Sequence, residues 1–237
     1  MQAFQRLTEK MHLITDLGAA AAVLGWDQET YMPDGAVAGR AEQLATLSSF
    51  IHQHTTNADT VAIVEDVKNE LPSLTPRQLL VAKTFIRDHD RSLKLPSDLV
   101  EEQARTASMA QDAWKRARQA SDFSIFEPLL AKTVDLKRRE AEIVGPAAHL
   151  YDNLLDSFEP GLTVDVLTPI FDRLRTGTVA LLAEITPKQD TVSDDVLYRS
   201  YNSDAQLASA TKIITTLGFD MNTGRVDLSA HPFCTSF

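Results

Sequence analysis

The sequence predicts an all-α fold, with one short β element near the C-terminal end. Glycine supplies only 9 of the 237 residues, about half of its usual share in globular proteins. The strong helix formers Ala, Leu, Gln, Glu and Arg are plentiful. Apolar residues recur mostly at steps of three and four, the period of an amphipathic helix, rather than at every second position. These observations together favour helices along nearly the whole chain.

The first predicted helices cover residues 2–24, 37–53 and 59–70. One apolar stripe marks the first of them: Phe4, Leu7, Met11, Ile14, Leu17, Ala21 and Leu24. This helix is expected to end near Gly25, before a turn-like segment that closes at residues 32–35. The second helix carries Leu44, Leu47 and Ile51 on one face.

The middle of the chain contains several helix start signals. Thr75 followed by Pro76 predicts an N-cap and a first helical residue, opening a helix to about residue 93. A further helix is expected at about 97–120. Ser124 and Glu127 have the spacing of a capping box, opening a helix to about residue 144. A shorter helix is predicted at about 148–158.

Two more helices and a change of period follow. Thr163 is expected to cap a helix to about residue 184, which Pro169 kinks or shortens. Ser203 and Gln206 form a second capping-box pattern, and Gly218 is a suitable residue just after that helix. In residues 225–230, apolar and polar residues alternate, which predicts a half-buried strand.

Composition excludes several function classes. With 23 basic and 33 acidic residues, the net charge is −10, which argues against binding nucleic acid or an anionic membrane. The single cysteine, Cys234, excludes an intrachain disulfide framework and a Cys-only zinc site. The first residues lack the basic and apolar regions of a signal peptide. A cytoplasmic protein is the expectation.

The sequence has few patterns that indicate a metal or nucleophilic site. It contains no H-E-x-x-H, G-x-S-x-G, P-loop or G-x-G-x-x-G motif. His52 and His54 lie two residues apart, so they would point in different directions on a helix, and solvated helix-end positions are favoured over a metal pair. Asp152, Asp156 and Glu159 would share one helix stripe. They would hold a cation or an Arg-rich surface, or be ordinary surface acids.

Several motifs are nevertheless recognisable together. The segment 26–35, Trp-Asp-Gln-Glu-Thr-Tyr-Met-Pro-Asp-Gly, continues to Arg-Ala-Glu-Gln-Leu-Ala at 40–45. Later matches, in order, lie at residues 114–118, 122–129, 137–140, 151–161 and 217–233, the last containing Leu-Gly-Phe-Asp, Gly-Arg-Val-Asp and His-Pro-Phe. In these segments the chain resembles the carboxypeptidase Taq family of zinc metallocarboxypeptidases, and the resemblance covers essentially its whole length.

The resemblance implies an N-terminal half only. Family members are about twice as long, and their His-Pro-Phe motif precedes a D-x-R-x-T segment, the H-E-x-x-H zinc site and a downstream Glu ligand. In such a site the two histidines and the later carboxylate hold the metal, and the Glu between the histidines activates a water. No catalytic residue and no metal ligand is therefore assigned here. His231, Pro232 and Phe233 are assigned to the wall of the substrate groove, with a structural turn as the alternative.

The resemblance also implies an organisation for the chain. Residues 1–70 would form lid-like helices, 71–218 a helical body, and 219–237 the start of the active-site β element. The expected function is a portion of an enzyme that removes C-terminal residues from peptides, with zinc or cobalt and the C-terminal half supplied elsewhere, and with a homodimer left open. The alternative is a non-catalytic helical module that binds peptides or a partner.

Overall fold

The structure is a computed structural model that describes residues 2–191, 193–231 and 233–235, and its regular elements are all helical. The predicted all-α fold is therefore confirmed. The α-helices are α1 (Gln2–Thr30), α2 (Val37–Thr56), α3 (Ala58–Glu70), α4 (Pro76–Ser92), α5 (Ser97–Ala120), α6 (Glu127–Val144), α7 (Asp152–Leu155), α8 (Val164–Ile185) and α9 (Ser203–Thr216). Short 3-10 helices are η1 (Asp34–Ala36), η2 (Leu71–Ser73), η3 (Phe123–Ile125), η4 (Thr186–Thr191) and η5 (Asp195–Tyr198).

The chain divides into two compact units. The first comprises residues 1–158 and 229–237, and the second comprises residues 159–228. The first unit holds α1 to α7, and the second holds α8 and α9. This division differs in its boundaries from the lid, body and β-element scheme that the family resemblance implies.

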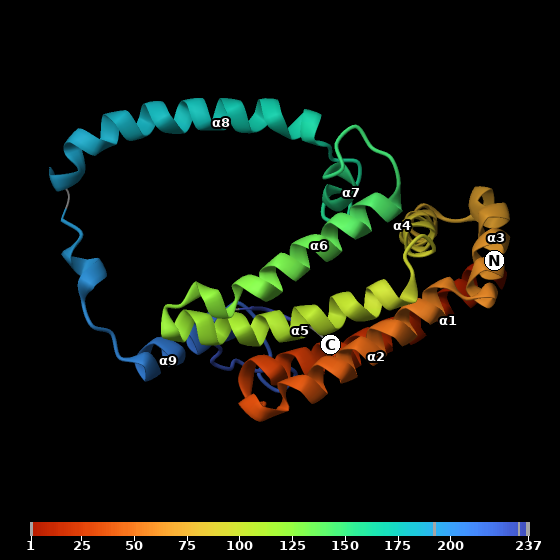
Figure 1. Cartoon of the computed structure of the whole chain (residues 1–237), viewed down its shortest axis with the longest axis horizontal. Coiled ribbons are helices and arrows are strands. Elements are labelled where there is room, and N and C mark those ends of the chain that lie inside the picture. Colours follow the sequence, from red (N-terminus) through yellow and green to blue (C-terminus); the bar gives the residue numbers. More distant parts are fainter. Residues whose placement is uncertain (1, 192, 232, 236–237) are drawn as a thin grey trace. The chain divides into compact units, whose positions relative to one another are not determined.

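Helices α1, α2 and α5 lie side by side in the first unit (Figure 1). Small residues make this close packing possible. On α2, Ala41, Ala45 and Ser49 follow at steps of four and are all buried, and on α5, Ala113 and Ala117 are buried in the same spacing. Side chains of this size let two helix backbones approach closely, so the packing requires few large apolar residues.

A second region of the core joins α1, α3 and α4. Leu7 and Val67 are completely buried there, beside Ile63 and Ala82. The start of α1 is fixed from outside the helix, because the Glu70 carboxylate accepts hydrogen bonds from the first backbone amides of α1, those of Ala3 and Phe4, at 3.2 Å each. These amides have no partner within their own helix, and a carboxylate also suits the positive end of the helix dipole.

A buried carboxylate links α4, α5 and α6. Glu140 of α6 is only 7% exposed. It accepts hydrogen bonds from Arg91 at 3.0 Å, from Gln103 at 3.0 Å and from Lys137 at 2.7 Å. Burial by itself would raise the pKa of the Glu140 carboxyl, but Lys137, Arg91 and Gln103 outweigh it and hold the pKa below its ordinary value. Three helices are thus connected through one ionised group.

Helix starts confirm some expectations and correct others. Thr75 caps α4 with Pro76 as the first helical residue, as predicted, and Gln78 completes a capping box that was not predicted. The Ser124 capping box is wrong, because the Ser124 hydroxyl donates to Asp122 at 2.7 Å instead. At α9 the cap is Asn202, whose side-chain oxygen accepts from the Ala205 amide at 3.0 Å.

Two helix lengths differ from expectation, those of α1 and α7, whereas the length of α8 agrees with it. α1 does not end near Gly25 but continues to Thr30, because tertiary packing against α2 and α5 outweighs the weak helix propensity of one glycine. α7 spans only four residues, whereas a helix over 148–158 was predicted. α8 begins at its Thr163 cap and runs through Pro169 to Ile185.

The predicted strand at residues 225–230 is not formed, and the described part of the chain contains no strand. A strand requires a hydrogen-bonded neighbour, and an isolated hairpin is only marginally stable. The preceding turn is nevertheless well defined. Gly218 has φ +98°, as expected for the residue after a helix end, and the Phe219 ring lies where a Cβ on Gly224 would be. Any larger residue at position 224 would have to displace the Phe219 ring.

Candidate functional site

The end of α1 meets the middle of α5 through a reciprocal pair of buried side chains. The Gln28 amide donates to the Ser108 carbonyl at 2.9 Å, and the Ser108 hydroxyl donates to the Gln28 amide oxygen at 2.8 Å. Gln28 is 7% exposed and Ser108 is 6% exposed. Because a buried polar group without a partner is costly, these bonds fix the register between the two helices.

A charged pair lies next to this contact. The Lys115 ammonium is 3.1 Å from the Glu29 carboxylate and also donates to the Gln28 carbonyl at 3.0 Å. The Gln111 amide donates to the same Glu29 oxygen at 3.1 Å. The Glu29 and Lys115 side chains are 15% and 19% exposed. Glu29 is thus a held carboxylate rather than a freely moving surface acid.

A second ion pair connects the last turns of α1 with α2. The Arg40 guanidinium is 2.6 Å from the Asp27 carboxylate and also donates to the Leu24 carbonyl. Arg40 comes from α2, so this contact holds the end of α1 against α2. The segment 26–35, which carries the first recognisable motif, therefore has defined partners for two of its three acids.

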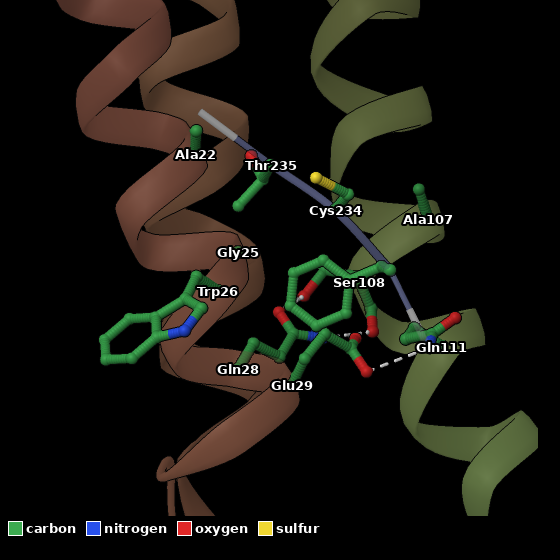
Figure 2. Close-up of a pocket in the computed structure, with 11 residues that line it drawn as sticks. Ala22, Gly25, Trp26, Gln28, Glu29, Ala107, Ser108, Gln111, Cys234 and Thr235 are labelled. Atoms are coloured by element: carbon green, nitrogen blue, oxygen red, sulfur yellow. Dashed lines mark hydrogen bonds between the residues drawn. The ribbon is translucent and has the colours of Figure 1, made fainter. Parts of the chain in front are cut away.

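A pocket of about 420 Å³ lies over these polar residues (Figure 2). Its floor is formed by α1 and α5, and residues 233–235 cross it. Figure 2 shows Gln28 and Glu29 directed from α1 toward Gln111 and Ser108 of α5, with Cys234 and Thr235 along the crossing segment. The lining combines carboxylate, amide and hydroxyl side chains with the aromatic residues Trp26 and Phe233. A mixed polar and aromatic lining of this kind suits a small organic or peptidic ligand.

Two residues of the His-Pro-Phe motif, His231 and Phe233, have described contacts near this pocket. The His231 ring meets the Trp114 ring edge-on, with centroids 5.6 Å apart and an interplanar angle of 71°. The Arg118 guanidinium also lies over the Trp114 ring, 5.6 Å from its centroid. Phe233 lines the pocket itself, and Pro232 lies outside the described residues. Phe233 thus lines the pocket and His231 packs on Trp114 of α5, while their assignment to a substrate-groove wall stays a prediction.

The other sequence candidates do not assemble into one site. His52 is buried, and burial lowers the pKa of its imidazole, with a hydrogen bond to the Leu95 backbone opposing that shift. The Nδ1 atom of His54 is buried without a hydrogen-bond partner in the described structure. α7 ends at Leu155, so Asp152, Asp156 and Glu159 do not share one helix stripe.

A metal centre is not formed by the described residues. Within residues 2–191, 193–231 and 233–235, no three His, Cys, Asp or Glu side chains gather where they could hold a metal ion. Cys234 is a free, exposed thiol. The described helices also include none that is long and apolar enough to cross a membrane.

Two polar contacts were not predicted from the sequence. The Gln28–Ser108 pair joins residues 80 positions apart, and the Arg91–Glu140 pair joins residues 49 apart. Each residue alone is an ordinary polar residue on an amphipathic helix. The only available signal was that Gln28 and Glu29 belong to the first recognisable motif.

Comparison with known proteins gives one consistent match. The family model of the carboxypeptidase Taq (M32) metallopeptidases matches residues 6–237. Thermostable carboxypeptidase 1 of Thermus thermophilus is 31% identical over 244 residues, covering 98% of this chain and 48% of that protein. Thermostable carboxypeptidase 1 of Pyrococcus furiosus is 31% identical over 246 residues, covering 100% of this chain and 48% of that protein.

Solved structures agree with the sequence matches. The crystal structure of the protein BsuCP superposes with a TM-score of 0.95 at 26% identity, covering 100% of this chain and 48% of that one. Metallocarboxypeptidase 1 of Trypanosoma cruzi gives a TM-score of 0.79 at 27% identity, covering 99% of this chain and 48% of that one. The chain thus spans about half the length of the relatives that it matches, consistent with their N-terminal half.

Proposed function

Because the chain belongs to the carboxypeptidase Taq (M32) metallopeptidase family, we propose that it supplies the N-terminal helical portion of a zinc-dependent carboxypeptidase. That enzyme would remove amino acids from the C-terminal ends of peptides in the cytoplasm. The observation that carries this proposal is the family match, which runs over residues 6–237.

We assign the pocket over α1 and α5, here called the α1–α5 groove, to peptide binding. His231, Pro232 and Phe233 would form its wall, with Trp26 and Phe233 offering apolar contact to a side chain and Gln111 offering hydrogen bonds to a peptide backbone. In support, Trp26, Gln111 and Phe233 are among the residues that line the pocket, and the Gln28–Ser108 hydrogen bonds connect the two helices beneath it. Residues 1–70 would act as the lid, 71–218 as the body, and 219–237 as the approach to the active site.

The described residues do not fit the metal centre of such an enzyme, because they bring no three suitable ligands together. The sequence also contains no H-E-x-x-H motif. We therefore derive no catalytic step through a metal and assign the zinc or cobalt ligands to a polypeptide that corresponds to the other half of the relatives. What this chain contributes is the binding and orientation of the peptide.

Peptidase assays test whether this chain binds the peptide while the metal ligands come from the other polypeptide. The purified chain, given zinc or cobalt, should release no amino acid from an N-blocked dipeptide. After mixing with a polypeptide made from the part of Thermus thermophilus carboxypeptidase 1 that lies beyond the match, we expect release that a chelator abolishes. Chelator-sensitive release by the chain alone would contradict the proposal. A chain that binds peptides, but stays inactive in the assembled complex, would instead be a non-catalytic binding module.

A further inference from the structure

Helix α8 (Val164–Ile185) of the second unit presents an apolar stripe to solvent (Figure 1, teal). Residues 167, 171, 174, 178, 181 and 185 follow at alternating steps of four and three, which is the heptad spacing of a helix that packs along a partner. Six large apolar side chains on this stripe are between 44% and 60% exposed: Ile170, Phe171, Leu174, Leu181, Leu182 and Ile185.

The stripe is free of charge. At 100° per residue, the six side chains and Leu167 fall within about a third of the helix circumference. The charged residues of α8 lie outside that arc: Asp165, Asp172, Arg173, Arg175 and Glu184. Thr178, beside Gly177, is the small residue at the centre of the stripe. A helix with one apolar and one charged face is stable in water only when the apolar face is covered.

The second unit does not cover this stripe itself. Neither α8 nor α9 contains a buried residue. Contacts of α8 within the unit are chiefly with η4, which is its direct continuation in the chain. No described helix has the length and apolarity of a membrane span. The stripe extends over 18 residue steps, or roughly 27 Å at 1.5 Å per residue, which is enough to seat several turns of a partner helix.

We propose that the α8 stripe is the docking surface for the polypeptide corresponding to the half of the relatives that this chain does not span. This inference rests on the proposed function. The solved relative BsuCP matches 100% of this chain, yet the matched part is only 48% of that protein. A family member therefore carries as much polypeptide again, whose folding against this region would bury an uncharged helix face of this size. The partner surface would be an apolar helix face or groove with a matching heptad spacing.

The test is a binding measurement between the full chain and the polypeptide from Thermus thermophilus carboxypeptidase 1 that lies beyond the match. Leu174→Glu places a charge in the centre of the stripe, and Ala183→Glu places the same charge on the opposite, polar face. Both positions are exposed, so circular dichroism should show unchanged folding. We expect the unsubstituted chain and A183E to bind alike and L174E to bind at least tenfold more weakly.

Three results would overturn the assignment. The first is no binding by the unsubstituted chain, and the second is equal binding by L174E and A183E. The third is a homodimer of the chain that L174E dissociates and A183E does not, because the stripe would then bind a second copy of this chain. Peptidase activity is scored separately in the same mixtures. A complex that forms through the stripe but lacks activity contradicts the proposed function and leaves the docking surface in place.

Discussion

The two units of the chain are stabilised in different ways. In residues 1–158, Leu7, Val64, Val67 and Leu99 are at most 1% exposed, so α1 to α6 are held by their own core. In residues 159–228, the described residues include none that is buried. An isolated helix is only marginally stable in water, and most helix stability in proteins comes from packing an apolar face. The first unit is therefore stabilised by its own core, whereas α8 has no core of its own in the described residues.

The ion pairs of the two units also differ in burial and in the distance along the chain that they span. In the first unit, ion pairs such as Lys115–Glu29 and Arg91–Glu140 connect different helices and are largely shielded from water. In residues 159–228, the ion pairs that the structure describes are local: Arg175–Asp172 is an exposed pair three residues apart, and Arg225–Asp227 is two residues apart. The exposed Arg175–Asp172 pair contributes little, and the Arg225–Asp227 pair connects only neighbouring residues of one turn.

The largest expected effect compares one leucine from each unit. Leu7→Ala should lower the free energy of unfolding by about 2–5 kcal/mol, because it leaves a cavity in a fully buried site. Leu174→Ala, at a side chain that is 60% exposed, should change it by less than about 0.5 kcal/mol. Urea unfolding followed by circular dichroism measures both. Equal effects would show that α8 is packed in the isolated chain.

A smaller effect is expected from the buried carboxylate. Glu140→Gln keeps the size of the side chain but removes the charge that Arg91 and Lys137 contact, and it should cost about 1–3 kcal/mol. The exposed neighbour Glu142→Gln is the matched control and should be nearly neutral. Since the pKa of Glu140 is lowered by folding, its contribution is complete above pH 4.5 and is lost as the pH falls through the lower folded value.

A third substitution tests the floor of the groove. Ser108→Ala removes the hydroxyl that donates to Gln28 at 2.8 Å, and the cost should be about 1 kcal/mol. Ser124→Ala, at an exposed hydroxyl on the same unit, provides the control. If the groove binds peptides as proposed, S108A should also weaken peptide binding by the chain more than S124A does. A stability loss without any change in peptide affinity would separate the Gln28–Ser108 pair from the proposed site.

The sequence predicted features that depend on neighbouring residues better than features that depend on residues far apart in the chain. The start of α4 at Thr75 and Pro76 depends on neighbouring residues alone, and it was predicted correctly. The continuation of α1 through Gly25 depends on packing against α2 and α5, and local propensity gave the wrong end. The strand at 225–230 was predicted from alternation alone, but a strand also requires a neighbour. Trp26, Glu29 and Phe233 of the recognised motifs line the pocket, whereas the Gln28–Ser108 contact beneath it joins positions 80 apart, which no local pattern predicts.

The smallest expected effect is a pH dependence confined to the first unit. Folding buries His52 and lowers the pKa of its imidazole from the ordinary value of 6.5. As the pH falls below 6.5, the unfolded chain takes up a proton at this position before the folded chain does, so the free energy of unfolding decreases. The decrease ends below the folded pKa, where both states are protonated.

Replacing the imidazole isolates this contribution. His52→Asn should flatten the pH dependence of stability between pH 7 and pH 5, measured by urea unfolding at each pH. The exposed His12 is the matched control, and His12→Asn should leave the slope unchanged. α8 and α9 contain no buried residue, so we expect their stability to be independent of His52. Hydrogen exchange of their amides, after correction for its intrinsic pH dependence, should therefore not change with the protonation of His52. If H52N and the unsubstituted chain show the same slope, proton uptake at His52 is not linked to the folding of the first unit.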